Sequence, residues 1–123
     1  MFNLISGKKG SGKTKELIKM ANEDVVTSDG SVIFIDRDKS HMYNLKHTMR
    51  LINMNEFPVK TKDEFFGFLC GLISNNYDIE SIYIDGLMKV MDIENSEVEE
   101  FSVKTKELAN KYKIKIVSTL SED

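Results

Sequence analysis

Short runs of apolar, mainly β-branched residues recur along the chain and predict β-strands at residues 2–6, 32–36, 81–85 and 114–118. The first three runs lack a strict alternation of apolar and polar positions, whereas the last run has the alternation of an edge strand. Continuous apolar runs indicate strands covered on both faces, and the segments between them are long enough to be crossover helices. We therefore expect an α/β fold: a three-layer αβα sandwich with a mainly parallel sheet.

Helical patterns fill the segments between these runs. A weak pattern predicts a helix over residues 40–50, and residues 51–57 are a candidate further strand before Pro58, which makes four or five strands. After the first run, apolar or small residues form one stripe at helical spacing: Thr14, Leu17, Ile18 and Ala21.

Capping boxes predict where two later helices begin. Thr61 is followed three positions later by Glu64, and Ser96 is followed in the same way by Glu99. Each pair precedes apolar residues at helical spacing, so we expect one helix after each pair.

The composition indicates one globular domain over residues 1–123, because 41% of the residues are hydrophobic and 30% are charged. The net charge of -3 gives no overall field that would gather nucleic acid or an anionic membrane. Cys70 is the only cysteine, which excludes an internal disulfide and indicates a core thiol. The first residues have neither the length nor the flanks of a signal peptide or membrane span, so a cytoplasmic location is expected.

One glycine-rich segment matches a phosphate-binding motif at every defined position. The sequence GKKGSGKT fits the pattern G-x-x-x-x-G-K-[ST] and lies between a predicted strand and a predicted helix. Glycines let successive amides point inward at the positive end of the following helix, which creates an anion site. The predicted nucleotide-binding residues are Gly7, Lys8, Lys9, Gly10, Ser11, Gly12, Lys13 and Thr14.

The residue types of this loop predict ATP or GTP with Mg²⁺ as ligands. Lys13 is expected to neutralise the β and γ phosphates, and the Thr14 hydroxyl to coordinate magnesium. A side chain at Gly12 is expected to block the approach of the phosphates. Lys8 and Lys9 have the alternative interpretation of solvated loop charges.

A second candidate element ends the predicted strand at residues 81–85. Asp85 follows three apolar or aromatic residues and is a candidate magnesium ligand, since ligands lie at the carboxyl ends of strands in open α/β sheets. The alternative is an Asp-Gly turn, because Gly86 follows. A hydroxyl at the tip of the last strand is a candidate γ-phosphate sensor.

A carboxylate can polarise the attacking water in hydrolysis, and the second strand supplies two candidates for this role. Asp38 and Asp36 lie at its end, where either could face the γ phosphate. With Ser40, they could instead cap the next helix. The predicted catalytic residues are Lys13, Asp38 and Asp85.

The order of these features resembles RecA-like P-loop ATPases along almost the whole chain. The resemblance rests on the loop at residues 7–14, the segment 34–38, the strand ending in Asp85 and the polar-tipped last strand. It implies an ATPase with its catalytic acid near the end of the second strand, where Asp38 replaces the usual glutamate. No stretch resembles the DNA-binding loops of such proteins, so recombinase activity is not implied.

Two local resemblances extend the alternatives. Residues 11–18 are similar to the loop and first helix of thymidine kinases, although the zinc-binding cysteine pairs of that family are missing. Lys8 stands where ParA- and MinD-type ATPases carry a signature lysine that acts across a dimer, whereas Lys9 replaces a glycine that they need.

We therefore expect a minimal ATPase or switch with slow Mg²⁺-dependent hydrolysis, acting alone, as a homodimer or with a protein partner. The alternatives are a nucleotide-sensing module that does not hydrolyse and a small-molecule kinase of the thymidine-kinase type. His41 and His47 are six positions apart, a spacing that does not bring both to one helix face. We interpret them as surface or capping residues and expect no zinc site.

Overall fold

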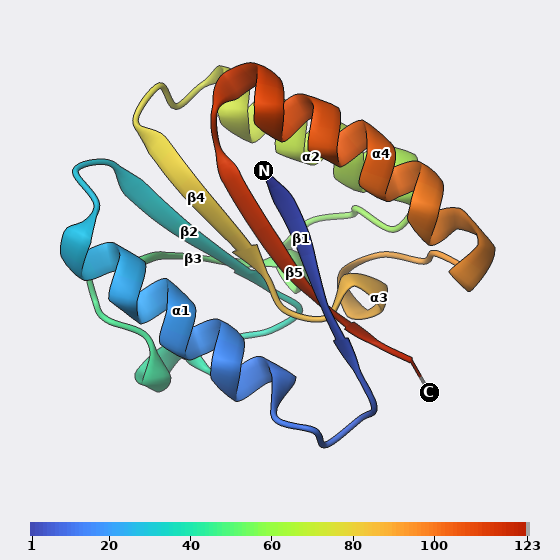
Figure 1. Ribbon diagram of the computed structural model, residues 1–123, viewed down its shortest axis with the longest axis horizontal. Coiled ribbons are helices and arrows are strands. Elements are labelled where there is room, and N and C mark those ends of the chain that lie inside the picture. Colours follow the sequence, from blue (N-terminus) through green and yellow to red (C-terminus); the bar gives the residue numbers. More distant parts are fainter. Residues whose placement is uncertain (123) are drawn as a thin grey trace.

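The computed structural model describes residues 1–122 and contains one five-stranded sheet in the order β1-β5-β4-β2-β3. Every pair of neighbouring strands is parallel (Figure 1). The predicted α/β fold with a parallel sheet is therefore confirmed. The strands are β1 Phe2–Gly7, β2 Ser31–Asp36, β3 Arg50–Asn53, β4 Ile79–Ile84 and β5 Lys115–Ser121.

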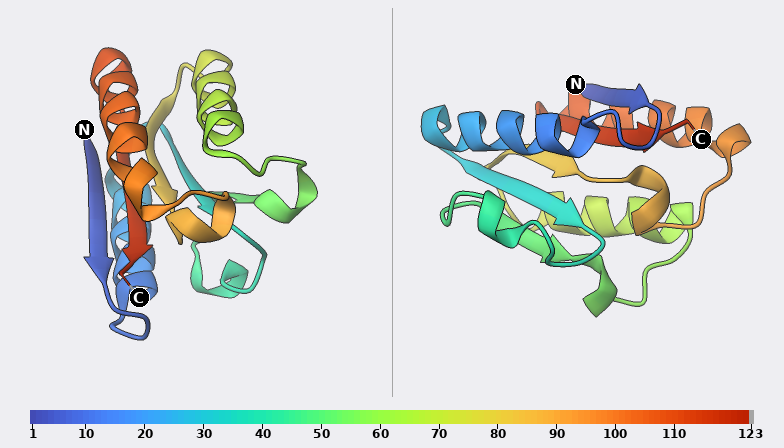
Figure 2. Two further views of the ribbon diagram at one scale, coloured as in Figure 1. Left: turned by 90° about the vertical axis from the view of Figure 1, so that its right-hand side faces the viewer. Right: turned by 90° about the horizontal axis from the view of Figure 1, so that it is seen from below.

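Helices connect the strands and cover both faces of the sheet, which is compatible with a three-layer sandwich (Figure 2). Helix α1 covers one face, and α2 and α4 lie together on the other. The α-helices are α1 Lys13–Thr27, α2 Lys62–Ser74, α3 Leu87–Val90 and α4 Asn95–Tyr112, and the two short 3-10 helices are η1 Met42–Asn44 and η2 Met54–Glu56.

Strand β2 is apolar along nearly its whole length because its two faces pack against different helices. Val32 and Phe34 pack against α1, whereas Ile33 and Ile35 belong to the core beneath α2 and α4. Successive side chains of a strand point to opposite faces, so a strand covered on both sides requires apolar residues at every position. The same arrangement explains the buried residues of β4, where Tyr83 faces α1 and its neighbours face the other core.

Two expectations between β2 and α2 need correction. The helix predicted over residues 40–50 is wrong: only Met42–Asn44 is helical, as the single 3-10 turn η1. The Asn22 side chain bonds the Asn44 carbonyl and the Lys46 amide, at 2.9 Å each, and so binds backbone groups that a helix would use internally. The fifth strand exists, but β3 ends at Asn53, whose side chain accepts a hydrogen bond from the Asn55 amide and starts η2.

The capping boxes were predicted with mixed success. Thr61 and Glu64 form the box at the start of α2, as expected. The box at α4 lies two positions earlier than predicted, because Glu97 Oε1 accepts from the Glu94 amide at 3.1 Å. Glutamate therefore replaces Ser96 at the start of this helix. The short helix α3 was not predicted.

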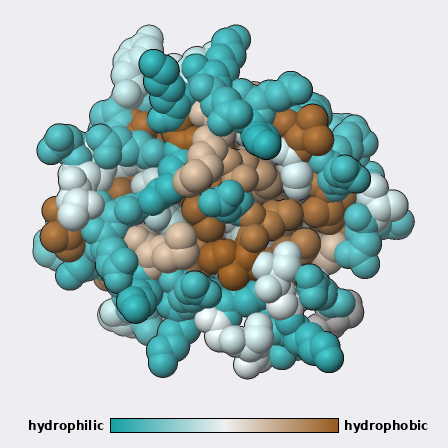
Figure 3. All heavy atoms as spheres, in the orientation of Figure 1, coloured by the Kyte–Doolittle hydropathy of each residue, from teal (hydrophilic) through white to brown (hydrophobic). Residues whose placement is uncertain are grey.

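The surface turned to the viewer in Figure 3 has apolar atoms in its middle and hydrophilic atoms around the rim. The middle of this view corresponds to the position of the edge strand β1 in Figure 1. Phe2 and Leu4 of β1 are partly buried and pack against the core beneath α4. Within residues 1–122, no helix has the length and apolar character required to span a membrane.

Candidate functional site

The carboxyl ends of the parallel strands meet at one edge of the sheet, and most of the predicted site residues lie there. The loop of residues 7–14 leads from β1 into α1, as predicted. Gly10 and Gly12 have φ angles of 84° and 89°. These angles favour glycine, because a β-carbon is disfavoured in the left-handed region. A side chain at Gly12 would therefore strain the backbone.

The Lys13 side chain folds back across the loop. Its Nζ donates hydrogen bonds to the carbonyl oxygens of Gly7, at 2.9 Å, and Lys8, at 2.7 Å. The Ser11 amide also donates to the Lys8 carbonyl, at 3.1 Å. The ammonium group thus lies against the backbone of the glycine-rich loop, where it contributes a positive charge to the anion site that the loop would form.

Asp85 joins the loop to the sheet. It follows β4 directly, is 2% exposed, and accepts hydrogen bonds from the Thr14 hydroxyl at 2.9 and 3.2 Å. Thr119 of β5 donates to the same carboxylate at 2.9 Å and accepts from the Gly86 amide at 2.6 Å. Strand β5 lies between β1 and β4 in the sheet. Its polar tip therefore lies between the strand that leads into the glycine-rich loop and the strand that ends before Asp85.

These groups line a cavity of about 320 Å³. It is bordered by the loop residues Lys9, Gly12 and Lys13 and by Asp85 and Thr119 at the strand ends. Its size falls in the range of small-molecule pockets, and its lining combines glycines with lysines and one buried carboxylate. The geometry therefore brings together the loop residues, Thr14 and Asp85, all of which were singled out in the sequence.

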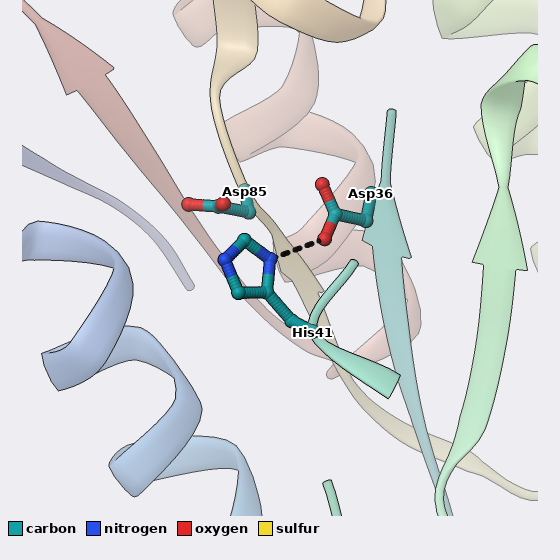
Figure 4. Close-up of side chains that lie close together, drawn as sticks. All are labelled: Asp36, His41 and Asp85. Carbon is teal, nitrogen blue, oxygen red and sulfur yellow. Dashed lines mark hydrogen bonds and ion pairs between the residues drawn. The ribbon is translucent and has the colours of Figure 1, made fainter. Parts of the chain in front are cut away.

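A second buried carboxylate and a histidine stand beside Asp85. Asp36 ends β2, is 3% exposed, and its Oδ2 lies 2.9 Å from His41 Nδ1. Figure 4 shows the imidazole of His41 between the carboxylates of Asp36 and Asp85. One ligand atom from each of the three residues lies within 4.8 Å of the other two. This arrangement places a titratable pair next to the predicted magnesium ligand.

The electrostatics of Asp36 differ from those of an exposed carboxylate. Burial raises the pKa of Asp36 above its ordinary value, and the charge of Asp85 acts in the same direction. Hydrogen bonds from His41 and the Arg37 amide oppose the shift but do not cancel it. A carboxyl group with a raised pKa is a better proton acceptor than an ordinary one.

Asp38, the predicted catalytic acid, lies in a different environment. Its Oδ1 accepts from the Ser40 amide at 2.9 Å, and hydrogen bonds with Ser40 lower the pKa of Asp38. Neither Asp38 nor Asp36 is among the residues that line the cavity of the glycine-rich loop. Asp38 lies in a turn, in contact with Ser40, whereas Asp36 and His41 lie close to Asp85.

Sequence interpretation did not identify His41 as part of the site. Its spacing from His47 suggested a surface or capping position, and His47 is indeed exposed. His41 instead reaches Asp36, five positions earlier, across the turn that follows β2. An aspartate at the end of a strand and a histidine five residues later can be predicted to be in contact only if the path of the turn between them is known.

No protein-family model matches the chain. A search of curated proteins also finds no significant match. Any function of this site must therefore be inferred from its residues and their geometry.

Proposed function

We propose that the chain binds ATP or GTP together with Mg²⁺ at the cavity beside residues 7–14 and hydrolyses the nucleotide slowly. The observation that carries this proposal is the hydrogen bond between Thr14 and Asp85. It joins the last residue of a complete G-x-x-x-x-G-K-[ST] motif to a carboxylate at the end of a neighbouring parallel strand. Motif, loop conformation and sheet position thus agree on one site.

The chain's own groups supply the recognition of a polyphosphate. Left-handed glycines at positions 10 and 12 curve the backbone, and the loop continues into the N-terminus of the 15-residue helix α1. Lys13 exchanges its bonds to the carbonyls of Gly7 and Lys8 for the phosphate oxygens. A triphosphate is a stronger partner for an ammonium group than a neutral carbonyl, because the bond is charge-assisted at both ends.

The donor set fits Mg²⁺. The Thr14 hydroxyl and the Asp85 carboxylate are oxygen donors in contact with each other, and magnesium prefers one or two such protein oxygens plus phosphates and water. Thr14 and Asp85 would hold the ion, Asp85 through a water molecule. The bound ion would neutralise phosphate charge. Thr119, hydrogen-bonded to Asp85, would hold this carboxylate in place.

Asp36 with His41 is the better candidate for orienting the attacking water. Both lie next to Asp85, and the raised pKa of Asp36 suits a proton acceptor. In this proposal Asp36 accepts the proton of the water, and His41 holds the carboxylate by the contact at Nδ1. Asp38 would then stabilise the turn through its contact with Ser40 and take no part in the reaction.

The experiment that tests this function is release of inorganic phosphate from ATP and GTP by the purified protein. We expect slow release that requires Mg²⁺ and is lost in Lys13→Ala. Release from the wild type no greater than from Lys13→Ala, for both nucleotides, would contradict hydrolysis.

A second candidate function is nucleotide sensing without turnover. It is favoured by Gly86, which follows Asp85 at the position where many hydrolysing P-loop proteins carry a glutamate. Tight binding of ATP with no phosphate release, together with a change in self-association or partner binding, would favour this function over an ATPase.

A further inference from the structure

A second cavity of about 370 Å³ lies at the same edge of the sheet as the cavity of the glycine-rich loop. Lys89 of α3 lines both cavities. Its aliphatic stem lies over Gly86, since a β-carbon at position 86 would come 2.7 Å from Lys89 Cδ. Lys89 thus stands on the boundary between the two cavities.

The lining of this cavity divides into an apolar floor and a cationic rim. Met54 and Met91 are buried, with exposed fractions of 4% and 3%, and both line it. Arg37, Lys60 and Lys89 are exposed and line it as well. In residues 1–122 none of these three side chains makes a hydrogen bond or a close ion pair with a protein group.

Backbone contacts hold the segments of this rim together. The Asn55 amide donates to the Arg37 carbonyl at 3.2 Å, which ties η2 to the end of β2. The Asp92 amide donates to the Lys60 carbonyl, and Thr61 pairs with Asp92 as an isolated bridge. Since these ties do not depend on a ligand, the cavity is preformed.

Charge and shape together define the ligand. Three cationic residues and the acidic Asp92 line the cavity, which leaves a formal charge of +2. A phosphomonoester carries about -1.5 to -2 charges at neutral pH and offers three acceptor oxygens, so it matches this rim better than a carboxylate does. The buried methionines are suited to an apolar or aromatic body, because thioethers pack well against rings.

We propose that this cavity binds an organic phosphomonoester, with its phosphate at Arg37, Lys60 and Lys89 and its apolar body over Met54 and Met91. The site is distinct from the nucleotide site and does not depend on it. Lys89 lines both cavities, so a phosphate bound here would lie next to the cavity of the glycine-rich loop.

Phenyl phosphate is a suitable probe, and NMR titration of the full chain without nucleotide tests the site. We expect saturable shifts of the backbone amides of Val90 and Met91, and a much weaker response to phenol. Arg37→Gln should weaken phenyl phosphate binding by about tenfold, the effect of losing one charge-assisted hydrogen bond. Arg50→Gln is the matched control, because Arg50 is exposed, lies outside this cavity and is expected to leave the affinity unchanged.

Two results would overturn the proposal. Shifts confined to residues 7–14 would mean that the phosphate binds only at the glycine-rich loop. Equal affinities of Arg37→Gln and Arg50→Gln, both folded by circular dichroism, would mean that Arg37 does not contact the ligand; if Arg37→Gln is unfolded, Lys60→Gln takes its place under the same criterion. Because no nucleotide is present, absence of ATP and GTP binding would leave this test unaffected.

Discussion

The Thr14 hydroxyl donates to both carboxylate oxygens of Asp85, at 2.9 and 3.2 Å, although 71 positions separate the two residues. This contact joins the start of α1 to the end of β4 across the tip of β5. A hydroxyl and a carboxylate at this distance form an oxygen donor pair for Mg²⁺.

Replacing Thr14 therefore tests the metal dependence of nucleotide binding. Thr14→Val keeps the shape of the side chain but loses its oxygen. We therefore expect the gain in nucleotide affinity on adding Mg²⁺ to be about tenfold smaller in Thr14→Val than in the wild type. Thr14→Ser keeps the hydroxyl and should retain most of the improvement. Calorimetric titrations with Mg²⁺ and with EDTA measure the difference, and an undiminished effect of Mg²⁺ in Thr14→Val would contradict a ligand role.

The two aspartates at the end of β2 can be separated by mutation. Asp36→Asn should lower phosphate release by about a hundredfold or more, the lower end of the range expected for loss of a proton acceptor, with little change in nucleotide affinity. Asp38→Asn, which affects the turn near Ser40, should release phosphate almost as the wild type does. The reverse order of the two rates would assign the role to Asp38.

Gly86 has two structural reasons to be glycine. Its φ is 78°, and a β-carbon would collide with the stem of Lys89. Gly86→Ala should therefore destabilise the fold by about 1–3 kcal/mol. Gly67→Ala is the control: this glycine is exposed in α2, a β-carbon added there meets no side chain or distant backbone within 4 Å, and alanine should stabilise the fold by up to about 1 kcal/mol. Urea unfolding measures both, and equal stability of Gly86→Ala and the wild type would refute the strain.

The contact of Asp24 with Lys115 makes stability depend on pH. Burial alone would raise the pKa of Asp24, but hydrogen bonds with Lys115 and Tyr83 and the charge of Lys115, 2.5 Å away, lower it overall. A lowered pKa means that the carboxylate stabilises the fold above the ordinary value of 3.8, and that this contribution is lost as the pH falls through the lowered pKa.

Asp24→Asn should accordingly cost about 1–2 kcal/mol at pH 7. The difference from the wild type should shrink as the pH is lowered below about 4. Asp29→Asn, at an exposed position, should change stability by less than about 0.5 kcal/mol at either pH. Unfolding curves across this pH range provide the measurement, and a constant difference down to pH 2 would argue against the ion pair.

The glycine-rich loop and the sheet could be predicted because their determinants are local. Residues 7–14 contain the whole motif, and residues 32–36 are apolar at every position but the last, as a doubly covered strand requires. Thr14 and Asp85 could be placed at one edge because parallel strands end on the same side of a sheet. Local pattern and topology were sufficient for that part of the site.

The path of the chain after β2 could not be predicted, because it depends on contacts between distant residues. Asn22 of α1 fixes Asn44 and Lys46, which lie 22 and 24 positions away, and so replaces the expected helix by a turn. His41 is part of that turn and reaches Asp36 as a result. The second cavity has the same origin, since Arg37, Lys60 and Lys89 belong to three separate segments.

Retention of nucleotide by the purified protein tests the central claim most directly. Equilibrium dialysis with Mg²⁺ and non-hydrolysable analogues of ATP and GTP should show saturable binding of at least one of them. Lys13→Ala should weaken this binding by about tenfold or more, because it removes a charge-assisted contact with the phosphates. Lys19→Ala, on the exposed side of α1, should bind as the wild type does. No retention of either analogue at millimolar concentration, or equal retention by wild type and Lys13→Ala, would contradict the account.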